Sequence, residues 1–218
     1  MDLREALSSA HLFAGAGPEE LTTLAAAAFP RRLARGQVLF VEGERSDHLY
    51  VVVSGRLKVQ VSSHHGDALL LAVLGAGESA GELSILDGRP RSATAEALDE
   101  VQLIAVPADT VRTVLAGSSA LALAWAQDLA LTVRRLTGSA ADLVFLDLPR
   151  RLAKLLVGAG ASEVDLGMSQ SEVAARLGVA RQSLNRALSG FTRRGWIQVE
   201  GSTVRLRDPA ALARFAGS

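Results

Sequence analysis

The 218-residue sequence predicts an α+β fold made of an N-terminal antiparallel β-roll, one long helix and a C-terminal winged helix-turn-helix. Two patterns lead to this expectation. Short β-like runs separated by glycines occupy residues 38–106, and helical periodicity follows Pro107. Residues 1–147 carry 12 Lys/Arg against 18 Asp/Glu, a balance of −6, whereas residues 148–218 carry 11 against 5, a balance of +6. We therefore expect an acidic part and a basic part with different tasks, and the basic part is a candidate for nucleic-acid binding.

Composition narrows the possible chemistry. The chain has no cysteine, which excludes disulfides, thiolate zinc sites, cysteine-ligated iron–sulfur clusters and cysteine nucleophiles. His64 and His65 are expected at a solvated hairpin tip, while His11 and His48 have no partner at ligand spacing. We therefore expect no metal and no haem. Because no nucleophile–base pair or nucleotide-hydrolysis motif is visible, we also do not expect an enzyme.

The sequence predicts a cytoplasmic protein without a membrane partner. The longest apolar run, Ala68–Leu74, is much shorter than the ~18 residues needed to span a bilayer. Residues 1–5 do not combine a basic start with a following apolar stretch, so no signal peptide is expected.

Residues 2–107 supply the elements of the roll. Short helices are expected within residues 2–29, one of them starting at Pro18. Glycines then separate β-like runs at the several-residue spacing of an antiparallel roll. The expected strands are Val38–Val41, Leu49–Val53, Leu57–Val61, Leu69–Leu74, Ser92–Leu98 and Val101–Val106.

The segment Gly81–Thr94 combines a glycine, a carboxylate, an arginine and a hydroxyl around a short turn. Arg91 can bind a phosphate as a two-pronged donor. Glu82 can accept a hydrogen bond from a ribose hydroxyl, and Gly81 lets the backbone approach a ligand closely. Together these residue types fit a sugar phosphate that carries a free hydroxyl.

One long helix is expected from about Ser118 to Leu143. Its apolar residues alternate in spacings of four and three, the heptad pattern of a coiled coil. They are Ala122, Ala126, Leu129, Val133, Leu136, Ala140 and Leu143. Such a helix either packs on its own domain or forms a dimer, and its place between an acidic and a basic part favours the dimer. Residues 146–149 are the expected hinge, because Pro149 constrains the residue before it away from helix.

Residues 169–188 have the pattern of a helix-turn-helix. Ser169 and Glu172 have the spacing of a capping box, and Gly178 stands where a turn between two helices needs a left-handed residue. Apolar stripes complete both helices: Val173, Ala174 and Leu177 in the first, and Leu184, Leu188 and Phe191 in the second. The second helix would enter the DNA major groove with its N-terminal residues forward.

Four polar residues of that second helix lie away from its apolar stripe: Arg181, Gln182, Asn185 and Arg186. Arginine pairs with guanine, and glutamine or asparagine with adenine, so these side chains suit base edges. The alternative is an ordinary solvated helix face. The cap, the turn glycine and the local positive charge favour DNA, and Ser169 and Ser183 complete the predicted contact set.

The rest of the basic part fits a DNA-binding module. Residues 196–206 are expected to form a β-hairpin wing, with Arg193 and Arg194 near phosphates. Residues 208–216 are expected to form a short closing helix.

Taken in order, these elements resemble the CRP/FNR family of bacterial transcription regulators over about residues 10–207. Residues 81–94 resemble the family's phosphate-binding cassette, residues 145–147 its hinge, and residues 193–197 the segment after its recognition helix. The resemblance implies a dimeric regulator controlled by a cyclic nucleotide. Its implied partners are a near-palindromic double-stranded operator, a second copy of the chain and RNA polymerase. The implied domains are a cyclic-nucleotide-binding roll at 1–117, a dimerisation helix and hinge at 118–146, and a winged helix-turn-helix at 147–218.

The resemblance also implies roles for the cassette. Glu82 would bind the ribose 2′-hydroxyl, and Gly81 would supply a backbone contact. Arg91 and Ser92 would hold the cyclic phosphate. The Ala93 amide, Leu83 and Thr137 complete the implied effector site, and cyclic AMP is the implied effector.

Two departures from the family leave alternatives open. Alignment back from residues 145–147 places Leu136 and Thr137 where cyclic-AMP-responsive members have a threonine and a second small polar residue that contact adenine. Because leucine cannot make that hydrogen bond, cyclic GMP or permanent activity without a ligand is an alternative. Gln182 stands where the family's well-known recognition helix has glutamate, which leaves the preferred operator open. The roll alone would also fit a kinase or channel module, but the helix-turn-helix argues against it.

Overall fold

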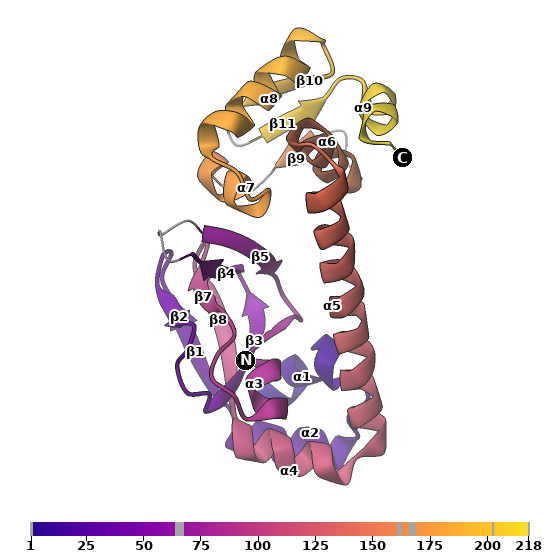
Figure 1. Cartoon of the computed structure of the whole chain (residues 1–218). Coiled ribbons are helices and arrows are strands. Elements are labelled where there is room, and N and C mark those ends of the chain that lie inside the picture. The colour runs from indigo at the N-terminus through magenta and orange to yellow at the C-terminus, as the bar shows by residue number, and fades with distance from the viewer. Residues whose placement is uncertain (1, 64–67, 161–162, 166–168, 202, 218) are drawn as a thin grey trace. The chain divides into compact units, whose positions relative to one another are not determined.

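The computed structural model describes residues 2–63, 68–160, 163–165, 169–201 and 203–217 (Figure 1). Its contacts divide it into two compact units, one of residues 1–61 and 71–134 and the other of residues 62–70 and 135–218. The long helix α5 (Ser119–Phe145) has residues in both. Helices and antiparallel sheets together confirm the predicted α+β class, while the expected domain boundaries after residues 117 and 146 stay predictions.

Short helices open the first unit: α1 (Leu3–Ser8), the 3₁₀ helix η1 (His11–Phe13) and α2 (Pro18–Ala27). The Asp2 carboxylate caps α1 by accepting a hydrogen bond from the Arg4 amide at 2.9 Å. Pro18 occupies the first turn of α2, where its missing amide proton is not needed. The expected helices are present, but they stop before residue 29, because Phe29 already pairs as a strand with Ala105.

Antiparallel strands form two four-stranded sheets. One has the order β1-β8-β3-β6, from β1 (Phe29–Leu33), β8 (Val101–Pro107), β3 (His48–Ser54) and β6 (Ser79–Ala80). The other has the order β2-β7-β4-β5, from β2 (Val38–Phe40), β7 (Thr94–Ala97), β4 (Leu57–Ser62) and β5 (Ala68–Leu74). Each expected run falls in one of these strands. β1 and β6 were not expected, because β1 lacks apolar alternation and β6 has only two residues. Both strands are defined by pairing with strands far along the chain, β1 with β8 and β6 with β3.

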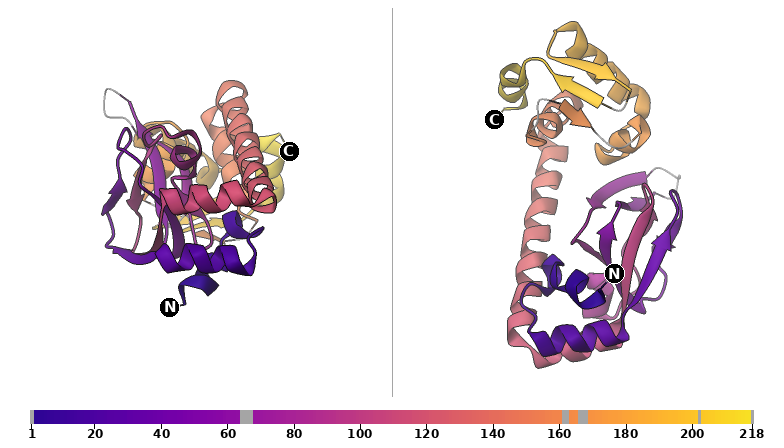
Figure 2. Two further views of the ribbon diagram at one scale, coloured as in Figure 1. Left: turned by 90° about the horizontal axis from the view of Figure 1, so that it is seen from below. Right: turned by 180° about the vertical axis from the view of Figure 1, so that it is seen from behind.

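Described residues of this unit form two apolar clusters. The first lies between the sheets, where inward residues such as Tyr50, Leu57 and Leu103 meet. The second packs the helices against the sheet and includes Leu121 and Trp125 of α5. Figures 1 and 2 show α1, α2 and α4 (Ala108–Gly117) gathered at one end of the strands. The roll therefore has a closed, helix-covered end and a cassette on the chain between β6 and β7.

Part of the cassette is helical rather than the short turn that we expected. α3 (Glu82–Asp87) begins at Gly81 and ends at Gly88, and both glycines have a left-handed backbone, with φ of +97° and +69°. These two glycines bound a helix of only six residues. The prediction of a simple turn was wrong because the glycines stand at the helix ends rather than within a turn.

α4 and α5 meet at Ser118, whose Oγ accepts a hydrogen bond from the Leu121 amide at 3.2 Å. The predicted long helix is thus confirmed as α5. Among the described residues no single helix is long and apolar enough to cross a membrane. α4 and α5 meet the length and composition requirement only as a pair, and they are bent by 113° at the break between them, which is weak support for a span.

The second unit holds the C-terminal elements. They are α6 (Leu148–Gly158), β9 (Glu163–Asp165), α7 (Gln170–Arg176), α8 (Arg181–Arg193), β10 (Ile197–Glu200), β11 (Thr203–Leu206) and α9 (Pro209–Ala216). The strands form a sheet of order β10-β11-β9. The predicted helix-turn-helix, hairpin and closing helix are all confirmed. One local expectation was wrong: Leu148 is helical although Pro149 follows it, because Asp147 caps α6 and the proline lies in the first turn.

Candidate functional sites

Gly81 brings the backbone of the cassette against Arg91. A side chain at Gly81 would place its Cβ 1.9 Å from Arg91 Nη1 and 3.3 Å from the His48 carbonyl oxygen. The φ of +97° already disfavours any residue with a Cβ. Both the backbone conformation and the packing therefore require glycine at this position.

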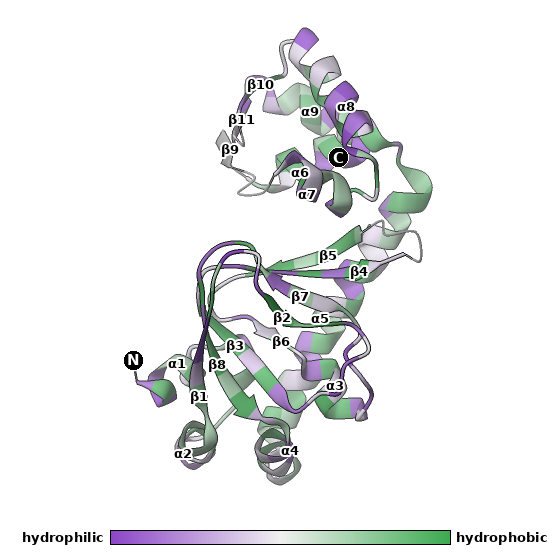
Figure 3. Ribbon diagram, turned by 90° about the vertical axis from the view of Figure 1, so that its left-hand side faces the viewer, coloured by the Kyte–Doolittle hydropathy of each residue, from purple (hydrophilic) through white to green (hydrophobic). Residues whose placement is uncertain are grey.

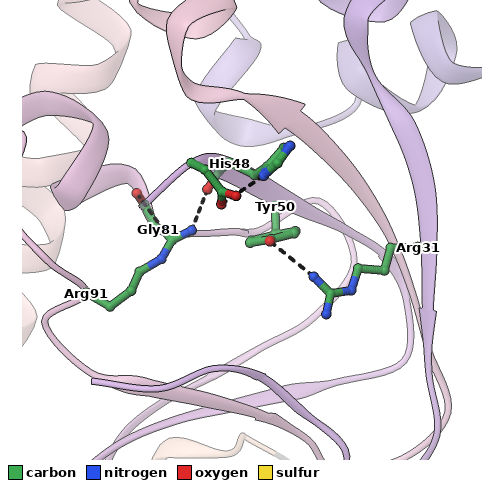
Figure 4. A network of polar contacts seen from close by, with 6 residues as sticks. Arg31, His48, Tyr50, Gly81 and Arg91 are labelled. Atoms are coloured by element: carbon green, nitrogen blue, oxygen red, sulfur yellow. Dashed lines mark hydrogen bonds and ion pairs between the residues drawn. The ribbon is translucent and has the colours of Figure 1, made fainter. Parts of the chain in front are cut away.

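Arg91 is buried, with 3% of its surface exposed. Its Nη2 donates a hydrogen bond to the His48 carbonyl at 2.7 Å, and Nη1 donates to the Gly81 carbonyl at 3.3 Å (Figure 4). Within the described residues it forms no ion pair, and its Nε is buried without a hydrogen-bond partner. Burial lowers the pKa of the Arg91 guanidinium. The roll thus holds a buried cation whose Nε–H is still available to donate a hydrogen bond.

Glu82 lies next to this cation, in the first turn of α3. Its Oε2 is buried and has no hydrogen-bond partner among the described residues. Burial raises the pKa of the Glu82 carboxyl, and the charge of Asp128 on α5 raises it further, against the lowering effects of backbone amides and of Arg91. Buried polar atoms without partners are uncommon in folded proteins and require an explanation. A ligand that donates to Glu82 and accepts from Arg91 would satisfy both residues.

The other predicted effector residues lie around this pair or apart from it. Leu83 is 41% exposed on α3, Ser92 is exposed, and Ala93 is buried. Thr137 is exposed on α5 beyond residue 134, in the second compact unit. The structure therefore brings the half-buried Gly81 and Glu82 together with the buried Arg91 in one group. Leu83, Ser92 and Ala93 adjoin this group along the chain.

The helix-turn-helix has the local geometry that the sequence predicts. Ser169 and Glu172 form the capping box, with the Ser169 amide donating to Glu172 Oε2 at 2.7 Å. Gly178 has a left-handed φ of +63° in the turn. Arg151 of α6 donates from Nη1 to the Leu177 carbonyl at 2.7 Å and so satisfies the end of α7. Hydrogen bonds thus stabilise both the start and the end of α7, before the turn that leads to α8.

α8 is amphipathic. Leu184, Leu188 and Phe191 are buried, whereas the predicted base-reading residues Arg181, Gln182, Asn185 and Arg186 are exposed and Ser183 is half-buried. Figure 3 shows this mixture as hydrophilic and hydrophobic segments along the helix. A helix that is anchored on one side and polar on the other suits insertion into a groove of DNA.

The wing follows α8 through an aromatic cluster. Arg194 lies with Cζ 4.9 Å from the centroid of the Trp196 ring and 5.6 Å from that of Phe215. The Trp196 ring packs 5.6 Å from Phe191 of α8. These contacts join α8, the hairpin and α9 into one small core.

Comparison with known proteins gives the same two-part organisation. The cyclic nucleotide-binding domain family matches residues 30–118, and the Crp-like helix-turn-helix domain family matches residues 150–215. A CRP-like cAMP-activated global transcriptional regulator of Mycobacterium tuberculosis is 34% identical over 97% of this chain and 99% of its own length. The cyclic AMP receptor protein of Thermus thermophilus is 31% identical over 94% of this chain and 96% of its own.

The chain belongs to the CRP/FNR family. A solved structure has the same fold: a transcriptional regulator of the CRP/FNR family from Thermus thermophilus, with a TM-score of 0.72 and 22% identity over 87% of this chain and 99% of that one. As a CRP/FNR member the protein is a transcription regulator with a cyclic nucleotide-binding domain and a DNA-binding helix-turn-helix. The relatives that match along nearly the whole chain are regulators rather than enzymes, which confirms the sequence-based expectation.

Sequence reasoning missed several residues of this CRP/FNR roll. Phe40, His48 and Tyr50 all contact the Arg91 guanidinium. His48 also pairs its Nδ1 with Asp47 at 2.8 Å, and in the described part of the chain no three His, Asp or Glu side chains gather as metal ligands would. The expected hairpin-tip histidines at 64 and 65 lie outside the described residues. The signal that could have indicated Phe40 and Tyr50 was that both are aromatic residues on strands that precede the cassette.

Proposed function

We propose that the protein is a dimeric, sequence-specific DNA-binding transcription regulator whose activity is controlled by a cyclic nucleotide, with cyclic AMP as the effector. One observation carries the effector part of the proposal. Arg91 Nε and Glu82 Oε2 are both buried without partners in the described residues and lie in neighbouring parts of one cassette. A cyclic phosphate accepts hydrogen bonds from the first, and a ribose 2′-hydroxyl donates one to the second.

Each cassette residue has a role in this proposal. Arg91 and Ser92 hold the cyclic phosphate, and the Ala93 amide adds a donor. Glu82 binds the ribose 2′-hydroxyl while Gly81 supplies the backbone contact. Leu83, which is exposed on α3, covers the ligand, and Thr137 contacts the base. Two relatives whose names include cyclic AMP support that nucleotide.

The DNA-binding part of the proposal assigns base contacts to α8. Arg181 and Arg186 read guanine, and Gln182 and Asn185 read adenine. Ser169 and Ser183 lie close to phosphates near the start of each helix. RNA polymerase remains a predicted partner that rests on the family resemblance alone.

The dimer is proposed from the exposed apolar surface of α5. Val133 is 60% exposed, and Leu136 and Leu143 are each 48% exposed, although all three belong to the predicted heptad seam. A second copy of α5 would bury these side chains in a coiled coil. A two-fold dimer in turn favours an operator with two inverted half-sites.

The decisive experiment is calorimetric titration with cyclic AMP and with cyclic GMP. The native protein should bind cyclic AMP, and Arg91→Ala should weaken binding by at least ~100-fold, because charge-assisted hydrogen bonds to the phosphate are lost. Arg89→Ala is the matched control, since it removes the same charge from a side chain that is 83% exposed and two residues away. Binding of neither nucleotide, together with DNA affinity that neither nucleotide changes, would contradict the proposal.

A second candidate function is ligand-independent regulation of the same kind. Leu136, which lacks any group that could hydrogen-bond a base, favours it. This candidate predicts that the nucleotide-free protein already binds, at full affinity, an operator selected from random DNA. Fluorescence anisotropy with and without cyclic AMP separates the two candidates.

A further inference from the structure

The Arg91 guanidinium rests on an aromatic surface outside the cassette. Its Cζ lies 4.2 Å from the centroid of the Phe40 ring on β2 and 5.6 Å from that of Tyr50 on β3. The two rings stack, with centroids 6.0 Å apart and planes inclined by 28°. Phe40 is 8% exposed and Tyr50 is 5% exposed, so the core of the roll fixes both rings.

The aromatic rings and the two backbone carbonyls contact different parts of the Arg91 guanidinium. The N–H donors of a guanidinium lie in its plane, and its face carries none. The Gly81 and His48 carbonyls therefore accept hydrogen bonds from donors in the plane, while the central carbon of the guanidinium lies over the Phe40 ring. A cation over a ring face is attracted by the ring's quadrupole, most strongly where water is excluded. The edge that carries the unpartnered Nε is left for a ligand.

We propose that Phe40 is a positioning residue for effector binding: it holds the plane of the Arg91 guanidinium so that the free edge faces the ligand's phosphate. The inference rests on the proposed cyclic-nucleotide function. A guanidinium held in its binding orientation loses little freedom when the phosphate arrives, which increases affinity. Burial lowers the pKa of Arg91, and the nearby acidic groups of Tyr50, Asp47 and Glu82 oppose that effect.

Tyr50 has a second task that makes it a useful control. Its hydroxyl accepts a hydrogen bond from Arg31 Nη1 at 3.2 Å, and Arg31 Cζ lies 5.6 Å from the Tyr50 ring (Figure 4). Tyr50→Phe removes this hydroxyl and keeps the ring beside Arg91. Phe40→Leu does the opposite, since it keeps apolar volume and removes the ring that lies over the guanidinium.

The test compares Phe40→Leu, Phe40→Tyr and Tyr50→Phe in the full chain by calorimetric titration with cyclic AMP and cyclic GMP. Phe40→Leu should weaken both nucleotides by about 10-fold, which corresponds to about 1.4 kcal/mol, because the phosphate is common to both. Phe40→Tyr restores the ring and should bind within about 2-fold of the native protein, as should Tyr50→Phe.

A spectroscopic measurement separates positioning from general packing. The Arg91 Nε–H resonance, assigned by its loss in Arg91→Lys, should carry a ring-current shift that is reduced in Phe40→Leu and persists in Tyr50→Phe. This measurement needs no ligand.

Native-like nucleotide affinity in Phe40→Leu would overturn the positioning role alone, and so would weakened affinity with an unmoved Arg91 resonance. A native protein that binds neither nucleotide would overturn the proposed function, and the positioning role with it.

Discussion

The two candidate sites are built in opposite ways. Arg91 in the roll is 3% exposed and takes its contacts from Gly81 and His48, which are 10 and 43 residues away along the chain. The proposed base-reading residues of α8 are exposed and come from one helix of 13 residues. The roll site is therefore a product of long-range packing, whereas the DNA site is a property of one amphipathic helix.

This difference decides how each site responds to change. In a buried site of low effective dielectric, a cation and its partners depend on one another, and losing one contact disturbs the rest. On an exposed helix each side chain contributes separately, and solvent and salt weaken its charge interactions. We therefore expect large, coupled effects in the cassette and smaller, separable effects on α8.

The largest expected effect tests the coupling inside the cassette. Gly81→Ala would force its Cβ to within 1.9 Å of Arg91 Nη1, so nucleotide binding should fall by at least ~100-fold as the guanidinium moves. Gly88→Ala is the matched control at the other end of α3. It has a φ of +69° with no heavy atom within 4 Å of the added Cβ, and it should cost only the left-handed strain of about 1–2 kcal/mol. Equal losses of nucleotide affinity in the two variants, measured by calorimetry, would show that the contact between residue 81 and Arg91 does not control nucleotide binding.

The next effect tests whether α8 acts separately from the roll. Arg181→Ala should weaken binding to the selected operator by about 10- to 100-fold, because a bidentate base contact contributes about 1–3 kcal/mol. Its affinity for cyclic AMP should stay unchanged. Arg214→Ala removes the same charge from an exposed position on α9 and should change operator affinity by less than about 3-fold at fixed salt. Anisotropy titrations give both values, and equal losses in the two variants would speak against base reading by α8.

A smaller effect concerns local stability in the second unit. Ser169→Ala removes the side chain that caps α7 and should destabilise the folded protein by about 1 kcal/mol, or about 2–4 °C in melting temperature. Ser189→Ala, at an exposed position within α8, should leave the melting temperature within about 1 °C. If thermal unfolding gave the same shift for both, the capping box would not stabilise the helix-turn-helix.

The smallest effect is a pH dependence of the roll. Burial, followed by the charge of Asp128, raises the pKa of Glu82 above its ordinary value of 4.5. The folded protein then binds this proton more tightly than the unfolded chain. The proton's stabilisation is fully present below the ordinary pKa and is lost as the pH rises through the raised one. Glu82→Gln should therefore melt at a higher temperature than the native protein above this window, and the difference should shrink below it.

Calorimetry without nucleotide, from about pH 4 to about pH 8, checks this prediction. Asp128→Asn serves as a partial control, because it removes only the second cause of the raised pKa. A difference between Glu82→Gln and the native protein that does not change with pH would mean that the Glu82 carboxyl titrates normally.

The sequence by itself determined the local features of both sites, namely the helix cap and turn of the helix-turn-helix and the residue types of the cassette. Ser169, Glu172 and Gly178 are local signals, so the helix-turn-helix could be predicted with its cap, its turn and its exposed face. The cassette residues Gly81, Glu82 and Arg91 were also visible, because their types and spacing lie within one short segment. Periodicity and end signals act over a few residues, which is why these predictions needed no tertiary information.

Only the tertiary structure decided what surrounds those residues. Phe40 and Tyr50 lie 51 and 41 positions before Arg91 in the sequence, and only strand pairing and the closure of the roll bring their rings against its guanidinium. The same holds for β1, which exists because Phe29–Leu33 pairs with β8 some 70 residues later. Contacts across such distances depend on the packing of whole sheets, and no local pattern of residues encodes them.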